Sequence, residues 1–297
     1  MRIFIVGATG VLGRTLIPLL REQGHTVRAL VRDRAKLFAD VGMETMVGDL
    51  LDASIESQLP TMLNGCNAAV HIATAIPRNP AAPAAWQTNN RLRTEGTRRL
   101  LDAALAAGVS RYIQQSIVMA YADGDDRWLD ESAPFDTTPA RASVALPVMT
   151  MEAMIREVAA SQLQWCILRG GAFVGPGTAQ ENLITQLLVG QVVVPDGGSN
   201  FISPIHVADM AVAVIAALER ASAGSTFNIV DTPQRYGDYV DNLADRLDAP
   251  HPQRDPNLPT PSSWRCTNQA AREMLGWTPT HSIWPNRSLQ SADSSDN

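Results

Sequence analysis

Three glycines near the N-terminus form the clearest chemical motif of this sequence. Gly7, Gly10 and Gly13 follow the apolar segment Arg2–Val6 and open a segment with helical apolar periodicity. In that context the first glycine permits a tight turn, the second lets backbone approach a pyrophosphate, and the third lets the helix pack closely. Free amides at the start of such a helix bind phosphate oxygens, so the motif predicts a dinucleotide site. The expected contacts come from Gly7, Thr9, Gly10, Val11, Leu12 and Gly13.

The end of the second expected strand bears on which dinucleotide binds. NAD(H) sites usually place an acid there for the ribose 2′-hydroxyl, whereas NADP(H) sites use arginine for the 2′-phosphate. This sequence has Val31 at the expected acid position, followed by Arg32 and then Arg34. Because guanidinium pairs with phosphate in a bidentate manner, the pattern favours NADP(H) bound by Arg32. The alternative is that both arginines are solvated and that Asp33 holds the ribose of NAD(H).

Two further short segments are expected at the same edge of the fold. Asp49 and Leu50 follow Gly48, and we expect them to contact the adenine. Ala73 and Thr74 follow another apolar strand and are expected near the cofactor, because the carboxyl ends of parallel strands share one edge.

The elements that position these residues alternate between strand and helix. The expected strands are Arg2–Val6, Val27–Val31, Ala68–Ala73, Arg111–Val118, Trp165–Leu168 and Thr226–Val230. The expected helices are Leu12–Gln23, Thr94–Ala107, Met149–Ala159 and His206–Arg220. Such alternation is typical of a parallel sheet covered on both faces. The sequence therefore predicts an α/β protein with a Rossmann-type, doubly wound sheet.

The chain is long enough for one large domain with a smaller lobe. Its 297 residues predict a Rossmann core over residues 1–165. Proline and glycine become more frequent after about residue 170, which predicts a substrate lobe over 166–285, interleaved with the last core elements. Residues 286–297 are polar and rich in serine and aspartate, so we expect a disordered tail.

The composition excludes several classes of protein. A formal net charge of -6 argues against a nucleic-acid partner. The N-terminus has no signal-peptide pattern and no apolar run reaches spanning length, which predicts a cytoplasmic protein without membrane association. Cys66, Cys166 and Cys266 are few and far apart, so neither a disulfide framework nor a metal site is expected.

At this point the sequence resembles the extended short-chain dehydrogenases/reductases, the NAD-dependent epimerase/dehydratase group. Beyond the glycine turn, the resemblance rests on Gly48-Asp49-Leu50, His71-Ile72-Ala73, Glu95-Gly96-Thr97, Ile167-Leu168-Arg169, Gly175-Pro176-Gly177, His206-Val207-Ala208-Asp209 and Leu275-Gly276-Trp277-Thr278-Pro279. It implies a seven-stranded parallel sheet, a small-molecule substrate and a C-terminal substrate lobe. It is compatible with a homodimer through the helices at 94–107 and 149–159, which could equally cover the core of a monomer.

The sequence departs from this family in its catalytic residues. Members normally carry a Tyr-x-x-x-Lys pair, in which the lysine lowers the pKa of the proton-transferring tyrosine. Aligning Glu152 with the usual glutamate puts Val144 and Val148 at those positions, and Lys36 is the only lysine in the sequence. The pair is therefore absent from this sequence at any alignment. Ile117 stands where the second serine of the family pattern would fall.

Two hydroxyl groups remain as candidates for contact with a substrate. We expect Ser116 near the nicotinamide and Tyr121 in the loop that follows, each as a hydrogen-bond donor, with local structural roles as the alternative. His206 and Asp209 form a candidate acid/base pair, although a helix-entry role is the more common use. Arg169 is expected to be structural or to face phosphate.

The expected substrate is less charged than a nucleotide sugar. Asn200 stands where nucleotide-sugar enzymes of the family have an arginine, although Arg265 could supply a cation. Four residues suggest an apolar pocket: Val144, Val148, Phe173 and Phe201. The sequence thus predicts an NADP(H)-binding reductase of a small carbonyl compound. The alternatives are a non-catalytic NADP-binding sensor or interaction module, and a redox-neutral lyase or isomerase.

Overall fold

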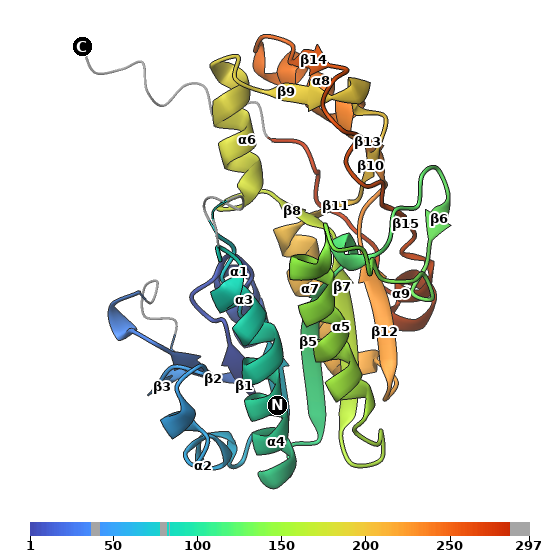
Figure 1. Cartoon of the computed structure of the whole chain (residues 1–297). Coiled ribbons are helices and arrows are strands. Elements are labelled where there is room, and N and C mark those ends of the chain that lie inside the picture. The colour runs from blue at the N-terminus through green and yellow to red at the C-terminus, as the bar shows by residue number, and fades with distance from the viewer. Residues whose placement is uncertain (37–41, 78–81, 83, 286–297) are drawn as a thin grey trace, which may run out of the picture.

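A seven-stranded parallel sheet forms the centre of the structure (Figure 1), a computed structural model that describes residues 1–36, 42–77, 82 and 84–285. Its strands are β1 Arg2–Val6, β2 Thr26–Val31, β3 Glu44–Val47, β4 Ala68–His71, β5 Arg111–Ile117, β7 Gln164–Gly170 and β12 Ser225–Ile229. They lie in the order β12-β7-β5-β4-β1-β2-β3. The predicted doubly wound sheet is confirmed, and the six expected strands begin and end within two residues of the observed ones.

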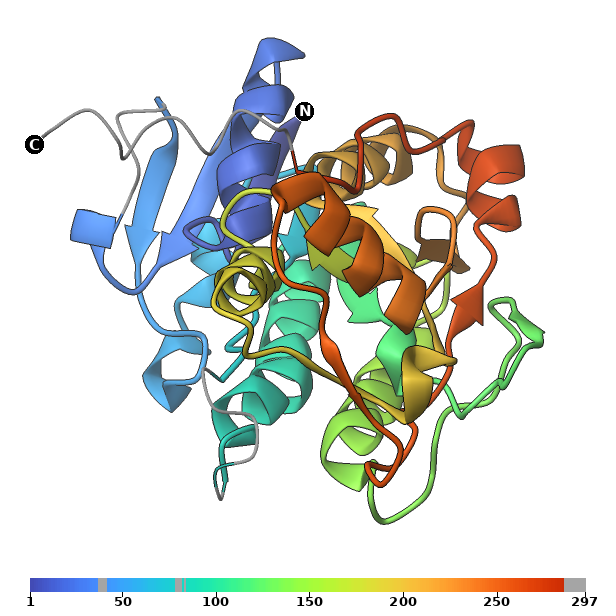
Figure 2. The same cartoon turned by 90° about the horizontal axis from the view of Figure 1, so that it is seen from above.

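Helices cover both faces of this sheet (Figure 2). One face carries α1 Val11–Glu22 and α7 Val207–Arg220, and the other carries α2 Leu59–Leu63, α4 Thr97–Ala106 and α5 Ala142–Arg156. Each layer encloses its own cluster of buried apolar side chains. Because both faces are buried, the central strands read as continuous apolar runs, as in Ile3, Phe4 and Ile5.

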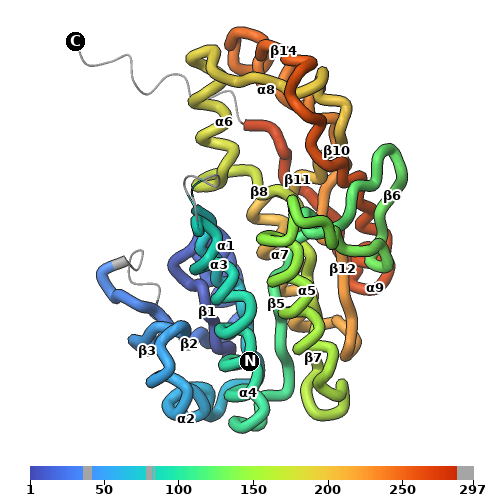
Figure 3. The backbone as a smooth tube through the Cα atoms, viewed as in Figure 1, coloured from blue at the N-terminus to red at the C-terminus, as the bar shows by residue number. Residues whose placement is uncertain are grey.

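A smaller lobe lies beyond the carboxyl edge of the sheet (Figure 3). It contains α6 Ala179–Leu188, α8 Tyr236–Leu247 and the strand pairs β9 Val193–Pro195 with β14 Gln253–Asp255 and β10 Phe201–Ile202 with β13 Gln234–Arg235. A third apolar cluster, which includes Leu187, Val194 and Leu243, holds it together. Between these segments the chain returns to the sheet through α7 and β12, so lobe and core interleave. β7 spans the boundary predicted at residue 165, and residues 286–297 lie outside the described residues.

The remaining elements connect these layers. They are β8 Ala172–Val174, β11 Pro204–His206, β6 Trp128–Leu129, β15 Arg265–Cys266, α3 Gln87–Arg91, α9 Gln269–Leu275, the short turns η1 Arg34–Lys36, η2 Ala53–Ile55, η4 Val118–Ala120 and η5 Asp196–Gly198, and the π-helical turn η3 Leu92–Gly96.

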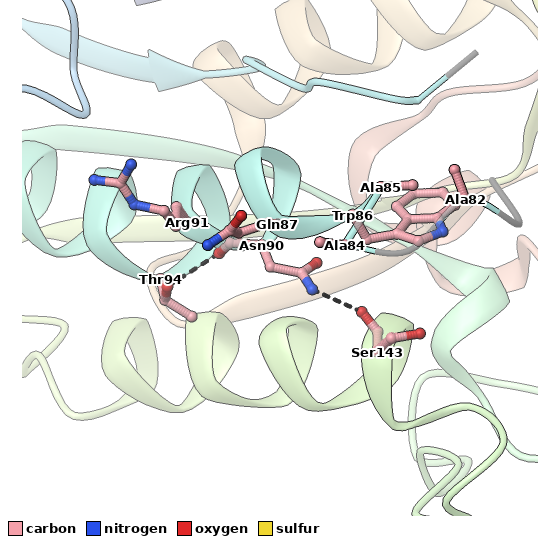
Figure 4. Close-up of a pocket in the computed structure, with 9 residues that line it drawn as sticks. All are labelled: Ala82, Ala84, Ala85, Trp86, Gln87, Asn90, Arg91, Thr94 and Ser143. Atoms are coloured by element: carbon pink, nitrogen blue, oxygen red, sulfur yellow. Dashed lines mark hydrogen bonds between the residues drawn. The ribbon is translucent and has the colours of Figure 1, made fainter. Parts of the chain in front are cut away.

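Helix α5 begins earlier than the sequence predicts. The expected range began at Met149, whereas the helix begins at Ala142 and contains Pro147. Proline lacks an N–H, so the carbonyl of Ser143, four residues earlier, cannot receive its usual helical hydrogen bond. The side chain of Asn90 on α3 supplies the missing donor, with Nδ2 at 2.9 Å from the Ser143 oxygen (Figure 4). The hydrogen bond from Asn90, which is distant in sequence, thus allows α5 to begin at Ala142 although Pro147 disfavours a helix there.

Candidate functional site

A cavity of about 740 Å³ follows the carboxyl edge of the sheet, at the ends of β1, β2, β4 and β5. Its lining includes ten residues that the sequence predicts to bind the cofactor: Gly7, Thr9, Gly10, Val11, Leu12, Arg32, Asp49, Leu50, Ala73 and Thr74. Gly13 is not in the lining. A Cβ at Gly13 would lie 2.4 Å from the Gly7 oxygen, so this glycine allows α1 to pack against the turn.

The glycine turn leaves space and free backbone donors at the start of α1. Gly7 has φ +105°, and a Cβ there would lie 2.6 Å from the Ala73 nitrogen, so a side chain is excluded. Gly10 caps α1 without any side-chain hydrogen bond. A Cβ at Gly10 would meet only the Gly7 oxygen, at 3.3 Å, within 4 Å. The open space and unpaired amides fit the pyrophosphate of a dinucleotide.

The three charged residues after β2 have different partners. Asp33 Oδ1 accepts a hydrogen bond from the Ala35 amide at 2.9 Å and closes the local turn. Arg34 Nη2 donates to the Thr45 carbonyl at 3.1 Å. Arg32 is exposed and is the member of this group that lines the cavity. The arrangement leaves the Arg32 guanidinium available to a ligand at the adenosine end.

The opposite end of the cavity is largely apolar. It is lined by Ile117 from β5, Met119 from η4, Val144 from α5, Phe173 from β8, and Trp264, with Arg141 beside Met119 and Trp264. Among the described residues, no histidine, glutamate, lysine, tyrosine or cysteine lines the cavity. This end therefore offers a substrate apolar contact but none of the usual side chains for proton transfer near neutral pH.

The structure brings Ser116 and Tyr121 together in a buried cluster that lies outside the cavity lining. Ser116 Oγ donates to Glu152 Oε1 at 2.7 Å. Tyr121 Oη donates to Asn228 Oδ1 at 2.7 Å and accepts from Arg169 Nη1 at 2.6 Å. Side chains alternate along a strand, so Ser116 points away from the cavity that its neighbours on β5 line.

Arg169 and Glu152 form the ion pair at the centre of this cluster. Arg169 Nη2 and Nε lie 2.7 and 3.0 Å from the two Glu152 oxygens, and both side chains are buried. Burial raises the pKa of the Tyr121 phenol far above its ordinary value, and the Arg169 charge opposes this effect. Arg169 thus has the structural role that the sequence left open. Val148, aligned with the usual lysine, is buried in the core, whereas Val144 lines the cavity.

The other candidate residues also have partners away from the cavity. His206 Nδ1 accepts a hydrogen bond from the Ala208 amide at 3.2 Å and caps α7. Asp209 is buried and accepts hydrogen bonds from Thr280 and His281. The hypothesis of an acid/base pair has no support in this geometry, because neither residue lines the cavity.

Three more residues that bear on the expected substrate lie outside the lining as well. Arg265 stacks on Trp128 and Phe201, with its guanidinium carbon 4.3 and 4.8 Å from the ring centroids. Asn200 is buried. Phe201 is therefore covered by a cation rather than open to a substrate, and Arg265 does not supply a cation to the cavity.

Several polar or aromatic residues of the lining were not predicted from the sequence, among them Arg93, Gln115, Arg141 and Trp264. They come from η3, β5, the residue before α5 and a late loop, and no local motif marks them. Arg93 lies three residues before Gly96 of the Glu95-Gly96-Thr97 segment, which was the nearest available signal.

A second hollow, of about 530 Å³, lies on the outer side between α3 and α5 (Figure 4). It shares Trp86 with the first cavity and is otherwise lined by small and polar side chains, including Asn90 and Ser143. No predicted site residue lies in this hollow.

The comparisons with known proteins agree with this geometry. Residues 3–230 match the NAD dependent epimerase/dehydratase family. The chain is 35% identical to a 3-diazoavenalumate denitrifying reductase of a Streptomyces species, over 96% of this chain and 98% of that protein. It is 28% identical to a 4-hydroxy-2-methyl-3-oxo-4-farnesyl-3,4-dihydroquinoline-1-oxide ketoreductase of Stigmatella aurantiaca, over 78% of this chain and 68% of that protein.

Solved structures share the fold. The chain superposes with a TM-score of 0.80 on a dTDP-glucose 4,6-dehydratase from Streptomyces venezuelae that holds NAD, with 21% identity over 95% of this chain and 93% of that one. The chain therefore belongs to the NAD dependent epimerase/dehydratase family, as the sequence motifs predict. More particularly, it is an NAD(P)-dependent oxidoreductase with a full-length similarity to a reductase.

No helix in the described part of the chain is long and apolar enough to cross a membrane. Within the same residues, no group of three or more His, Cys, Asp and Glu side chains could hold a metal ion.

Proposed function

We propose that this chain uses NADPH to reduce a small aromatic substrate by hydride transfer, without a proton-donating side chain. The observation that carries the proposal is the cavity of about 740 Å³. It joins the glycine turn and Arg32 to an apolar end that has no histidine, glutamate, lysine, tyrosine or cysteine among the described residues.

The preference for NADPH over NADH rests on Arg32. Arg32 lines the cavity with no hydrogen bond to another described residue, whereas Asp33 and Arg34 are held by Ala35 and Thr45. A guanidinium at this edge matches a 2′-phosphate, whereas Asp33, the acid that could bind a free 2′-hydroxyl, accepts from the Ala35 amide and does not line the cavity. Bound NADPH would supply a hydride at the nicotinamide, and the backbone amides of Val11 and Leu12 at the start of α1 would hold its pyrophosphate.

A calorimetric titration of Arg32→Ala tests this preference. Loss of a charged hydrogen bond costs about 1.5–3 kcal/mol, so the variant should bind NADPH roughly 10–100-fold more weakly and NADH equally well. Arg34→Ala is the matched control, because its side chain is held by the Thr45 carbonyl, and it should bind both dinucleotides like the parent. Equal losses for NADPH and NADH in Arg32→Ala would remove the basis for NADPH selectivity.

The absence of a proton donor favours a particular class of hydride acceptor. Reduction of a carbonyl gives an alkoxide, which needs a proton. Reduction of an aryl diazonium group does not, because the hydride forms a C–H bond, the C–N bond breaks and dinitrogen leaves with the bonding electrons. The full-length relative is named as a denitrifying reductase of a diazo compound. We therefore assign diazo-substituted aromatic compounds as the preferred substrate class.

The residues of the apolar end would bind and orient such a ring. Ile117 and Val144 occupy the positions that the family pattern gives to a serine and the tyrosine, and both line the cavity. Their apolar side chains exclude water, which protects an electrophile that water would otherwise attack. Phe173 and Trp264 provide flat surfaces for an aromatic ring.

The direct test uses two probes that share a ring and a carboxylate: 4-carboxybenzenediazonium and 4-formylbenzoate. The purified protein is mixed with each probe and with NADPH that carries deuterium at the transferred position. We expect benzoate with deuterium on the ring, release of dinitrogen and matching consumption of NADPH. Gly10→Val is the blank for non-enzymatic reduction, because Gly10 has φ -77°, which valine tolerates, and the side chain would fill the pyrophosphate space.

The other outcomes select among the functions that the sequence left open. Turnover of 4-formylbenzoate without diazonium reduction would restore the carbonyl reductase hypothesis, which the ketoreductase relative supports. NADPH binding without consumption with either probe would contradict a reductase and favour the non-catalytic module. Enzyme-dependent conversion of a probe at constant NADPH would favour the redox-neutral lyase or isomerase.

A further inference from the structure

Arg93 is a buried arginine that lines the cavity without a counter-ion. Arg93 is only 6% exposed, and its Nη1 is buried with no hydrogen-bond partner. In the described part of the chain, no hydrogen bond or ion pair involves its guanidinium. Arg93 lies on η3, a π-helical turn, and such turns are frequent at functional sites because they redirect side chains.

The other buried arginines of the described residues have the carboxylate partners that Arg93 lacks. Arg28 pairs with Glu44 at 2.8 Å and also donates to two carbonyl oxygens. Arg169 pairs with Glu152 at 2.7 Å. Burial without such partners is costly for a charged group. It lowers the pKa of Arg93 to about 10, which still leaves the side chain charged at neutral pH.

A second arginine adds positive charge to the same cavity. Arg141 Nη2 donates to the Met119 carbonyl at 2.7 Å, and the guanidinium lies 5.2 Å from the Trp264 ring centroid. Its Nε is buried and has no partner. Asp49 is the one acidic residue among the described residues that line the cavity. Its Oδ1 accepts from the Leu51 amide at 2.9 Å.

We infer that Arg93 is a binding residue for an anionic oxygen group of a ligand, a carboxylate or a phosphate, and that Arg141 assists it. This inference rests on the proposed function in so far as the ligand includes the substrate. The glycine turn and Arg32 already account for the pyrophosphate and the 2′-phosphate of the cofactor. A carboxylate on the substrate is therefore the favoured source of the anion, and aromatic carboxylic acids are the substrate class.

The inference explains why the fold tolerates an uncompensated charge. A ligand carboxylate would supply the counter-ion and accept two charged hydrogen bonds from the guanidinium. Met119 and Trp264, which lie beside Arg141 in the same cavity, would hold the attached ring. The cost of the buried charge in the free protein is offset only when the ligand binds, which is a common pattern in binding sites.

A binding experiment that needs no turnover tests Arg93. The protein saturated with NADP⁺ is titrated by calorimetry with cinnamate and with cinnamamide, which differ in the carboxylate. NADPH and NADH are each titrated in separate arms without cinnamate or cinnamamide. In Arg93→Met we expect cinnamate to bind roughly 10–100-fold more weakly and cinnamamide to bind equally well. Arg98→Met, on an exposed residue of α4, is the charge-matched control and should bind all ligands like the parent.

The arms separate the two sources of the anion and the two proposals. Weaker cinnamate binding alone identifies the carboxylate, and an equal loss for NADPH and NADH identifies a shared phosphate. Both results support the inference, even if the diazonium test fails. A thermal melt of the free protein guards against misfolding, because removal of an unpaired buried charge should raise the Tm by about 2–4 °C. Unchanged affinities for every ligand together with a lower Tm would show that Arg93 is structural and overturn the inference.

Discussion

The direction in which a side chain points decides whether Ser116 and Tyr121 have a catalytic or a structural role. Both side chains point into a buried cluster rather than into the cavity. The hydroxyls of both residues satisfy a buried ion pair, with Ser116 on Glu152 and Tyr121 on Arg169. A buried ion pair keeps its charge only if the remaining hydrogen-bond sites are filled. The cluster therefore connects β5, α5 and β7 and fixes the strand end that forms the floor of the cavity.

We expect Ser116→Ala to lower stability more than activity. Removal of one buried hydrogen-bond donor to a carboxylate costs about 1–3 kcal/mol of unfolding free energy. NADPH-dependent turnover at a temperature well below the melt should stay within about threefold of the parent, because Oγ does not line the cavity. Urea denaturation and initial rates measure the two effects. A loss of kcat of a hundredfold or more at unchanged stability would establish the catalytic role predicted from the sequence. Tyr121→Phe separates the same two roles.

His71 gives the protein a defined sensitivity to acid. It is buried at the end of β4, and burial lowers its pKa from 6.5 to about 4. The unfolded chain binds the proton near pH 6.5 but the folded chain does not, so stability is present above pH 6.5 and is lost as the pH falls towards 4. Between pH 7 and pH 4.5 this residue should account for about 2–3 kcal/mol of lost stability.

His71→Gln tests this by removing the titrating group from both states. Urea denaturation of parent and variant at the two pH values gives the difference between their losses. We expect the variant to lose about 2–3 kcal/mol less than the parent, whatever its absolute stability at pH 7. Equal losses in the two proteins would mean that other groups cause the acid sensitivity.

At the residue scale, local motifs predicted much of the cavity lining near the glycine turn but little of the lining at the opposite end. A Cβ at Gly10 or Gly13 would contact the backbone of the same turn, and a Cβ at Gly7 would contact the backbone just after β4. Because most of these contacts are local, the spacing of the glycines is enough to predict the turn. The interest of Arg93 is that it is buried without a partner. Whether a partner is present depends on the side chains of all neighbouring elements, which no local motif shows. Likewise, the sequence cannot show that the Ser116 hydroxyl meets Glu152, thirty-six residues later.

The start of α5 shows how an element can depend on another one. Pro147 leaves the Ser143 carbonyl without its helical donor, and Asn90 provides a donor from α3. Because this contact is distant in sequence, periodicity alone placed the helix start at Met149. The sequence also gave no prediction for β3, since Glu44–Val47 is a short edge strand with partly exposed side chains.

A double-mutant cycle measures the coupling between these two helices. Asn90→Ala should cost about 1 kcal/mol of unfolding free energy in the parent, where Pro147 cannot donate to the Ser143 carbonyl. In Pro147→Ala the new N–H can bond to that carbonyl, so the same change should cost clearly less. Equal costs in both backgrounds, determined by urea denaturation, would show that the Asn90 contact is not what permits the early start.

At the scale of the whole molecule, the segment after α9 connects the core to the lobe. Trp277 is buried in the apolar cluster of the α1–α7 layer, and Ile283 is buried in the lobe cluster. Between them, Asp209 at the start of α7 accepts hydrogen bonds from both backbone amides and both side chains of Thr280 and His281. Since the cavity lies between core and lobe, this connection also fixes the walls of the binding site relative to each other.

Asp209 should therefore control whether core and lobe unfold together. In the parent we expect one calorimetric transition that NADPH shifts to higher temperature as a unit. Asp209→Ala removes the acceptor of four hydrogen bonds and should cost about 3–5 kcal/mol, splitting the melt into two transitions. NADPH should then raise the temperature of the core transition more than that of the lobe, because the glycine turn and Arg32 both belong to the core.

Asp238→Ala, which changes an exposed acid in the first turn of α8, is the control and should retain a single transition. A single melt at the parent temperature in Asp209→Ala would show that apolar packing of Trp277 and Ile283 suffices to couple the two parts.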